Sequence, residues 1–405
     1  MHANSSPAVP SLIRELNERS VLDTLRAHGA LHAAEIARHI GLSKPTTADI
    51  LRSLTDSGLI EEYSPGEEDS KRARSVYEAI SDVKISLGID IGSRFIRAAV
   101  GDLNQQMRSE ISVPVTSLTL KDLTLVMHKA VDTVLKDAGY KLKDVASIVV
   151  GTPGVIDQAT GVVSIAGTIG SLDGVNLVAH IENEFGIHPT LENDINLVTA
   201  AEQSAGHGQG IDNFAVLSVG SGLGSGLVLN GQLHRGHRGA AGEIFYVPFG
   251  DPRDTHRSAT NPSGDRIAEI TRALANKYKS SSLVEPYSTV DILNAAKSGD
   301  ELGKAVVALE AERIALYIAA ISAVTDVELV VLSGGIGRQA TFFLEPIKKL
   351  VSEIVPFPPR IEVSVLGDTG ILIGALNIAT QQACDRVFND IHKSAVVVPG
   401  LAGSM

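Results

Sequence analysis

The spacing of apolar residues changes near position 81, and this change divides the chain into two predicted parts. Within residues 33–40, apolar side chains recur at the three- and four-residue spacing of an amphipathic helix. From Lys44 the same spacing returns and predicts a second helix. Its packed face would consist of Thr47, Ile50, Leu51 and Leu54. After Ile85, short apolar runs alternate with helical spacing, so we expect a small helical module followed by a larger α/β body.

Gly41, Leu42 and Ser43 separate the two predicted helices. Gly41 can adopt the positive φ of a tight turn, and the Ser43 hydroxyl can accept hydrogen bonds from the free amides of the second helix. Pro45 is favourable in that first turn. Two helices joined in this way indicate a helix-turn-helix, whose second helix enters the major groove of DNA. The residues expected to contact DNA are Ser43, Lys44, Pro45, Thr46, Thr47, Asp49 and Arg52.

Two short strands after the second helix predict a β-hairpin wing. Residues 59–63 and 75–80 have the composition and alternation of strands, and Lys71, Arg72 and Arg74 lie between them. Basic residues at such a tip can contact the phosphate backbone or the minor groove. A solvated hairpin without DNA contact is the alternative. We favour DNA contact because the hairpin completes a winged helix-turn-helix pattern.

The body shows one plan of strands and helices twice. Strands are expected at 85–92, 96–102 and 145–150, with a helix at 120–138, and similar strands follow at 214–220, 226–231 and 329–335. This repetition predicts a duplicated α/β fold with a cleft between two lobes. The expected domains are 1–81 for DNA binding and 82–405 for the body. Within the body, lobe 1 is expected at about 82–193 plus 375–392, and lobe 2 at about 194–374.

Three glycine turns follow predicted strands of the body. Without Cβ atoms, their backbone amides could approach the phosphate oxygens of a nucleotide from both lobes. A tight strand connection with no ligand is the alternative for each turn. The residues concerned are Asp90, Gly92, Gly220, Gly222, Gly224, Gly334 and Gly335.

Composition limits the classes of function. The chain has 35 Lys and Arg against 47 Asp and Glu, and its first 80 residues are also slightly acidic. DNA affinity would therefore depend on local basic clusters and on two copies binding together. The single cysteine, Cys384, excludes an intramolecular disulfide and a multi-cysteine zinc site. Because no signal peptide or membrane-spanning apolar stretch is evident, we expect a cytoplasmic protein with no membrane partner.

The order of these motifs resembles the ROK family, which contains sugar kinases and sugar-responsive repressors. The resemblance covers nearly the whole chain and rests on the winged helix-turn-helix and on residues 88–92, 151–157, 192–194, 220–226, 242–244 and 333–335. It implies a bilobal actin- or hexokinase-like body, that is, a duplicated ribonuclease-H-like fold. It also implies a ligand site formed by Gly154, Asn193, Asp194, Glu243 and Tyr246.

Three departures from the family pattern change what the resemblance implies. Ser93 and Arg94 follow Gly92, where kinase members have a second glycine and a threonine, so ATP binding is not expected. Residues 243–246 read Glu-Ile-Phe-Tyr in place of Glu-x-Gly-His, which alters the sugar pocket. The family's zinc cysteines are absent from residues 250–265, although His237 and His256 lie nearby. We therefore expect no metal and no cofactor.

The first hypothesis is a transcriptional regulator, a repressor of carbohydrate-related genes, that binds a double-stranded DNA operator as a dimer or tetramer. A sugar or sugar phosphate in the cleft would act as the effector by favouring one arrangement of the DNA-binding modules. One alternative is an active sugar kinase with a DNA-binding module, in which Asp194 would be the general base. Another is a regulator without a sugar effector. No catalytic residue is expected under the first hypothesis.

Overall fold

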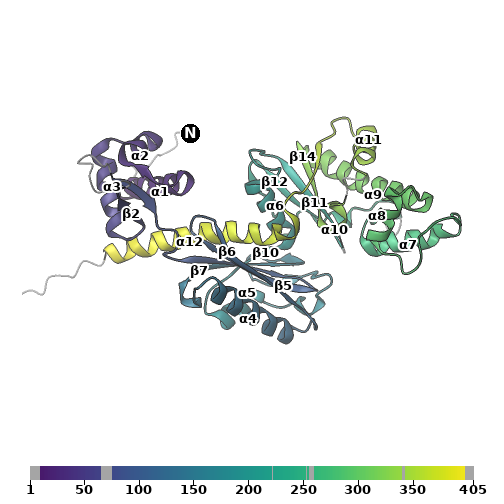
Figure 1. Ribbon diagram of the computed structural model, residues 1–405, viewed down its shortest axis with the longest axis horizontal. Coiled ribbons are helices and arrows are strands. Elements are labelled where there is room, and N and C mark those ends of the chain that lie inside the picture. Colours follow the sequence, from purple (N-terminus) through teal and green to yellow (C-terminus); the bar gives the residue numbers. More distant parts are fainter. Residues whose placement is uncertain are drawn as a thin grey trace, which may run out of the picture.

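The computed structural model describes residues 10–64, 75–220, 222–251, 253–254, 260–339 and 343–396. It has three parts, a small module and two lobes, which lie along one long axis (Figure 1). The long helix α12 (Gly370–Val396) runs from the small module to the junction of the lobes. The predicted order of a helix-turn-helix followed by a bilobal α/β body is confirmed.

The N-terminal module contains three helices and a three-stranded sheet. The helices are α1 (Pro10–His28), α2 (Ala33–Ile40) and α3 (Lys44–Asp56). The strands are β1 (Leu31–His32), β2 (Ile60–Tyr63) and β3 (Val76–Ala79), and β3 pairs antiparallel with both others. The predicted wing strands are therefore present, whereas β1 is too short for its apolar pattern to have been recognised. The core of the module contains Leu22, Leu25, Ile36, Ile50, Leu51 and Leu54.

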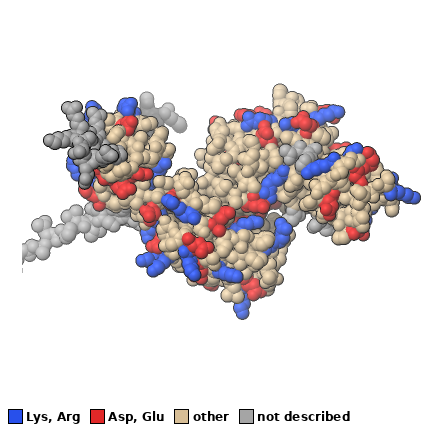
Figure 2. Space-filling model, in the orientation of Figure 1, with Lys and Arg blue, Asp and Glu red and all other residues tan. Residues whose placement is uncertain are grey.

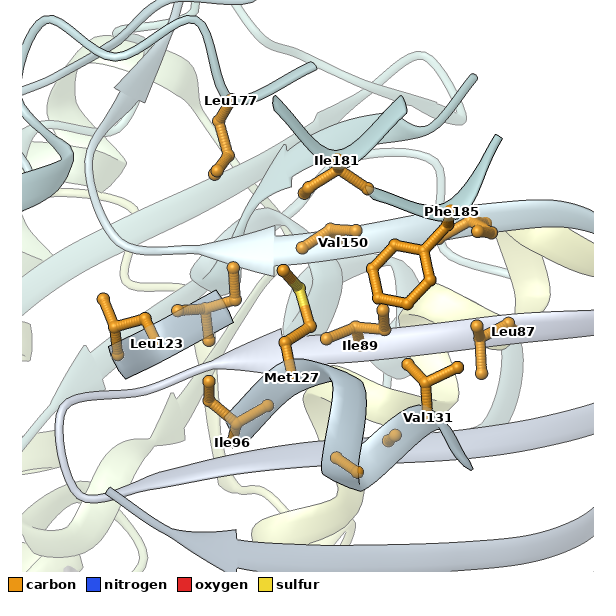
Figure 3. Packing of buried hydrophobic residues seen from close by; sticks show 14 of the residues in the cluster. Leu87, Ile89, Ile96, Leu123, Met127, Val131, Val150, Leu177, Ile181 and Phe185 are labelled. Atoms are coloured by element: carbon orange, nitrogen blue, oxygen red, sulfur yellow. The ribbon is translucent and has the colours of Figure 1, made fainter. Parts of the chain in front are cut away.

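Lobe 1 is built on a five-stranded sheet with the order β10-β7-β4-β5-β6. Its strands are β4 (Ile85–Ile91), β5 (Phe95–Asp102), β6 (Met107–Pro114), β7 (Val145–Thr152) and β10 (Thr190–Asn193). A short hairpin of β8 (Val155–Ile156) and β9 (Val163–Ser164) follows β7. The helices α4 (Leu120–Asp137) and α5 (Leu177–Phe185) cover one face of the sheet. Figure 3 shows Met127 and Phe185 from these helices packed against Ile89 and Val150.

Lobe 2 repeats the sheet of lobe 1. Its strands are β11 (Phe214–Val219), β12 (Leu223–Leu229), β13 (Gln232–Leu233), β14 (Leu329–Ser333) and β15 (Arg360–Val363). The order β15-β14-β11-β12-β13 matches lobe 1, and so does the direction of every strand pair. The predicted duplication is therefore confirmed. The helices of this lobe are α7 (Gly264–Ala275), α8 (Thr289–Lys297), α9 (Glu301–Thr325), α10 (Gly334–Gly337) and α11 (Leu344–Ile354).

Two helices each pack on the lobe opposite to the one whose last strand precedes them. Helix α6 (Asp194–Ala205) follows the last strand of lobe 1 but packs on β11 and β12 of lobe 2. Helix α12 follows the last strand of lobe 2 but packs on β4, β5 and β7 of lobe 1. The two helices cross closely at Gly374, where a Cβ atom would lie 1.9 Å from the carbonyl oxygen of Leu197. Helix α12 begins at Gly370, five residues before the predicted return of the chain to lobe 1.

The far end of α12 joins the core of the N-terminal module. Ala383, Val387 and Phe388 pack in one apolar cluster with Leu22 and Leu25 of α1. At the edge of this cluster, Arg19 forms an ion pair with Asp385, and its guanidinium carbon lies 4.6 Å from the centre of the Phe388 ring. The N-terminal module is thus attached to the body through α12 as well as through the chain connection near residue 81. Among the described helices, none combines the length and apolarity needed to cross a membrane.

Glu310 of α9 is a carboxyl residue buried in the interior of lobe 2. Its side chain is 2% exposed, and neither carboxylate oxygen has a hydrogen-bond partner. Burial raises the pKa of this carboxyl from 4.5 to about 8, against the opposing effect of the Arg313 charge. The native state therefore holds a proton between these pH values that the unfolded chain has lost. Stability consequently falls as the pH rises through this range.

We expect Glu310→Met to raise the free energy of unfolding at pH 8 by about 1–3 kcal/mol, because it replaces an unsatisfied carboxyl with an apolar side chain of similar volume. The gain should shrink as the pH is lowered toward 5. Denaturant unfolding at several pH values measures both effects. Glu312→Met, on the exposed side of the same helix, is the control. An equal gain at every pH would contradict a protonated Glu310 in the native protein.

Candidate DNA-binding surface and interlobe site

The N-terminus of α3 has the turn and the cap that the sequence predicts. Gly41 adopts φ +69° at the turn, and the Ser43 hydroxyl accepts a hydrogen bond from the Thr46 amide (3.3 Å). Pro45 lies in the first turn, where its missing amide hydrogen is not needed. These local features confirm the predicted start of the second helix.

One face of α3 is exposed in the described chain. Six of the seven residues expected to contact DNA lie on this surface, namely Ser43, Lys44, Pro45, Thr46, Asp49 and Arg52. The inclusion of Thr47 was wrong, because this side chain is 1% exposed and its hydroxyl donates to the Ser43 carbonyl oxygen (3.1 Å). Thr47 serves the packed face instead. DNA contact by the other six residues remains a prediction.

The described part of the predicted wing consists of two paired strands. Ile60 pairs with Ala79 and Tyr63 with Val76 in the antiparallel ladder. Lys71, Arg72 and Arg74 lie outside the described residues. On the face shown in Figure 2, basic and acidic side chains are interspersed over the whole molecule, without one extended basic region. This distribution agrees with a DNA-binding mode that depends on a few local contacts.

The junction of the lobes brings together three carboxyl groups from distant parts of the chain. Asp90 ends β4, Asp194 begins α6, and Glu243 precedes the short helix of residues 244–246. Burial raises the pKa of Asp90 to about 6, with a further rise from the charge of Asp194. Burial also raises the pKa of Glu243 and of Asp194, and the charge of Asp194 raises that of Glu243 further. Because the charge of Asp194 affects both Asp90 and Glu243, the three carboxyl groups lie near one another, and ligand binding by Asp194 and Glu243 stays a prediction.

Asn193 has a structural role at the junction of the lobes. Its side-chain oxygen accepts hydrogen bonds from the amides of Ile195 and Asn196 and so caps α6, while its side-chain nitrogen donates to the Gly154 carbonyl oxygen (3.0 Å). Gly154 adopts φ +102°, and a Cβ atom there would lie 2.7 Å from the Ser164 carbonyl oxygen. Asn193 and Gly154 thus connect the start of α6 to the β8–β9 hairpin. The N-cap position of α6 is thus filled by Asn193, and Asp194 is the first residue of the helix.

Tyr246 differs from the other predicted ligand residues. Its side chain is 52% exposed and packs edge-on against Phe245, with 5.8 Å between the ring centroids. Within the described ranges, no group of three or more His, Cys, Asp and Glu side chains could hold a metal ion. His237 is exposed, and His256 lies outside those ranges.

Two arginines at the junction were missed by sequence reasoning. Arg97 donates to the carboxylate of Asp90 (2.9 Å), which is its direct partner in the antiparallel β4–β5 ladder. Arg235 of lobe 2 donates to the buried Glu192 of lobe 1 (2.5 Å), and Asn196 also donates to Glu192. The register of the predicted hairpin could have placed Arg97 opposite Asp90. No local pattern links Arg235 to Glu192.

The glycine turns are tighter than predicted. The amide of Gly92 donates to the Phe95 carbonyl oxygen, and that of Gly220 donates to the Gly222 carbonyl oxygen. Gly334 adopts φ +79°, and a Cβ atom there would lie 2.5 Å from the Val219 carbonyl oxygen. The amides of Gly92 and Gly220 are thus used within their own turns.

The expected turn from Gly220 to Gly226 was too long. Gly224 and Gly226 lie inside β12, which begins at Leu223. A Cβ atom on Gly224 would lie 2.1 Å from the Ile195 side chain, and one on Gly226 would lie 2.0 Å from the Thr199 hydroxyl. Both glycines therefore permit the close approach of α6 to the sheet.

A match to a protein-family profile shows to which family the body belongs. The profile described as the ROK family matches residues 86–382. The chain belongs to the ROK family. A second profile, the IclR helix-turn-helix domain, matches residues 20–63, which include α2 and α3. The chain is therefore a ROK protein with a DNA-binding helix-turn-helix domain.

Relatives within the ROK family include regulators and kinases. A xylose repressor of Caldicellulosiruptor bescii is 22% identical over 386 residues, covering 90% of this chain and 96% of that protein. A glucokinase of Halalkalibacterium halodurans is 27% identical over 277 residues, covering 65% of this chain and 84% of that protein. The crystal structure of a ROK family transcriptional regulator, a homologue of the E. coli MLC protein, has a TM-score of 0.77 at 21% identity and covers 94% of this chain and 98% of its own. The presence of the helix-turn-helix domain places this chain among the regulators.

We expect Lys44→Ala and Arg52→Ala each to weaken binding to a DNA sequence selected by the full-length protein. Because both side chains are exposed on α3, each loss should correspond to about 1–3 kcal/mol. Fluorescence anisotropy at fixed ionic strength measures the change. Lys349→Ala, an exposed lysine on α11 of lobe 2, controls for the loss of one positive charge. Unchanged affinity in both variants would show that this face of α3 does not contact DNA.

Proposed function

We propose that this protein is a transcriptional repressor whose interlobe site binds a sugar or sugar derivative and thereby changes the affinity of the N-terminal module for DNA. The observation that carries the proposal is the course of α12. This helix crosses α6 at the junction of the lobes and then packs into the core of the helix-turn-helix module. A change in the relative position of the lobes would therefore reach α1 through one continuous element.

The junction has suitable chemistry for a polyhydroxylated ligand. Carboxylates accept hydrogen bonds strongly from hydroxyl groups. Asp194 lies where β10 of lobe 1 ends and α6 begins, whereas Glu243 precedes the short helix of residues 244–246 in lobe 2. The Glu192–Arg235 pair connects the lobes beside them. A ligand that donates hydroxyls to Asp194 and Glu243 would stabilise one arrangement of the lobes over another. Such differential binding is the requirement for a ligand-induced shift in DNA affinity.

The residues at the first glycine turn do not fit a magnesium nucleotide. The Asp90 carboxylate is ion-paired with Arg97, and the Gly92 amide is used within the hairpin. In lobe 2, the Gly264 amide at the start of α7 donates to the Gly220 carbonyl oxygen (2.9 Å). Phosphoryl transfer depends on a cradle that positions the nucleotide and its metal ion. We therefore favour ligand binding without phosphoryl transfer.

The proposed repressor acts as an oligomer. Two half-sites one DNA turn apart require two recognition helices about 34–36 Å apart, so a dimer is the smallest assembly that fits a pseudo-palindromic operator. The similarity to a xylose repressor over nearly the whole chain supports a sugar as the effector. It makes xylose a sensible first compound for binding experiments.

We expect calorimetric titration with a panel of neutral sugars, xylose included, to detect one that binds the full-length protein and lowers its DNA affinity. Asp194→Asn should weaken this sugar by at least about tenfold, because one charged acceptor is lost, while DNA binding without sugar is unchanged. A coupled assay with ATP and the same sugar tests the kinase alternative. Turnover that is lost in Asp194→Asn would contradict the proposed absence of phosphoryl transfer, and no heat with any sugar would contradict an effector of this class.

We expect the contact between Arg19 and the end of α12 to contribute to coupling. Arg19→Asp should reduce the effect of the sugar on DNA affinity by roughly twofold to fivefold, since exposed ion pairs contribute at most about 1 kcal/mol. Sugar affinity in the absence of DNA should not change. The charge-swapped double variant Arg19→Asp, Asp385→Arg should restore coupling. Equal coupling in all three proteins would show that the signal does not pass through this contact.

A further inference from the structure

Lobe 2 has a groove at the edge of its sheet opposite the glycine turns. The parallel strands β11, β14 and β15 all begin at this edge, and the segments that precede them form the groove. Its volume is about 510 Å³, within the usual range for a binding pocket. Because β11 and β14 are six and five residues long, the groove lies about 17–20 Å from the Gly220 and Gly334 turns. A molecule bound there would not compete with a ligand at the junction of the lobes.

Three carboxylates line the groove without partners of their own. Asp212 precedes β11, and Asp326 and Glu328 precede β14. All three residues are exposed, and in the described part of the chain none of their side chains forms an ion pair or hydrogen bond. The groove therefore carries three carboxylates to which the described residues offer no ion pair or side-chain hydrogen bond, although Arg360 follows Pro359 and its amide donates to the Glu328 carbonyl oxygen.

An apolar surface adjoins these carboxylates. Phe357 lines the groove together with Pro358 and Pro359, and the Phe357 side chain is 78% exposed. The Ser322 hydroxyl donates to the Phe357 carbonyl oxygen (3.2 Å), which holds this segment against the end of α9. Val324 on the same end of α9 is 85% exposed. The groove thus combines an aromatic ring and proline rings with acidic groups.

We propose that this groove binds an arginine- or lysine-bearing segment of a partner protein. A guanidinium or ammonium group can pair with the carboxylates while its aliphatic stem lies on Phe357 and the prolines. The inference goes beyond the repressor function and does not depend on it. It adds a protein contact on the body of a DNA-binding regulator, distant from both the DNA-reading helix and the sugar site.

The negative charge of the groove favours a basic protein segment over two other possible occupants, a second copy of the chain and DNA. A second copy of the chain would bring an identical groove to a symmetric contact, where the two sets of carboxylates would repel each other. The chain as a whole has a formal charge of −12, so other parts of a second copy also offer little positive charge on average. DNA is excluded from this surface by the same negative charge.

The test begins with a library of short random peptides displayed on phage and selected on the full-length protein. We expect the peptides that are enriched to carry arginine or lysine beside apolar residues. The affinity of a labelled, selected peptide is then measured by fluorescence anisotropy. It should fall at least about tenfold in the triple variant Asp212→Asn, Asp326→Asn, Glu328→Gln and also in Phe357→Ser. Asparagine tolerates the left-handed backbone of residue 326, where φ is +50°, so the fold should be retained.

A second triple variant provides the matched control. Glu301→Gln, Glu312→Gln and Glu345→Gln remove the same charge from exposed positions of lobe 2 outside the groove, and peptide affinity should be unchanged. DNA binding by every variant verifies folding. Enrichment without basic residues, or equal binding by the groove and control variants, would overturn the proposal. Self-association that is lost in Phe357→Ser would overturn it in favour of a contact between copies.

Discussion

The close crossing of α6 and α12 is the constraint on which the arrangement of the body depends. Each of the two equivalent sheets ends in a helix that packs on the other sheet, so neither lobe is complete without the other's terminal helix. At the crossing, the backbone of Gly374 occupies space that any larger residue would share with the Leu197 carbonyl. Gly151 of β7 is similarly close to the Leu197 side chain, with only 2.7 Å available to a Cβ atom. The lobes therefore meet at a packed pivot made largely of backbone.

This pivot also explains how a small movement could reach the DNA-binding module. Helix α12 has 27 residues and is about 40 Å long, and it packs on β4, β5 and β7, so lobe 1 and the crossing at Gly374 are joined to Phe388 by one continuous element. The Phe388 side chain is buried in the apolar cluster that also contains Leu22 and Leu25. The module is held to the body by apolar packing, with the Arg19–Asp385 pair at its edge. Packed interfaces of this kind tend to switch between discrete arrangements instead of deforming continuously.

The parts of the structure that depend on local chemistry were predictable from the sequence. The turn at Gly41, the cap at Ser43 and the β4–β5 hairpin each depend on residues within a few positions of one another. The errors concern contacts between distant segments. Gly224 and Gly226 look like turn residues until α6 is packed on β12, and the length of α12 is evident only when its two packing partners are known.

In the candidate sites, too, features that depend on local sequence were predictable, whereas contacts between distant segments were not. Periodicity identified the exposed face of α3, and it also placed Thr47 on the packed face, contrary to its inclusion among the contact residues. Asp194 and Glu243 were predicted as ligand residues from the family resemblance, since nothing in their local sequence indicates that they lie near each other. Arg97 could have been found from the hairpin register alone. The Glu192–Arg235 pair required the tertiary structure, because 43 positions separate its members.

The electrostatics of the junction give the lobes a reason to respond to a ligand. Arg97 compensates Asp90, but the raised pKa values of Asp194 and Glu243 show that burial opposes the charged forms of both carboxyls. The charge of Asp194 raises the pKa of Glu243, so the two carboxyls are unfavourable neighbours while both are ionised and lack hydrogen-bond donors. A polyol placed between them supplies donors to both and offsets the cost of their burial. Under the proposed function, such a ligand would stabilise the arrangement of the lobes that it binds, and α12 would connect that arrangement to the N-terminal module.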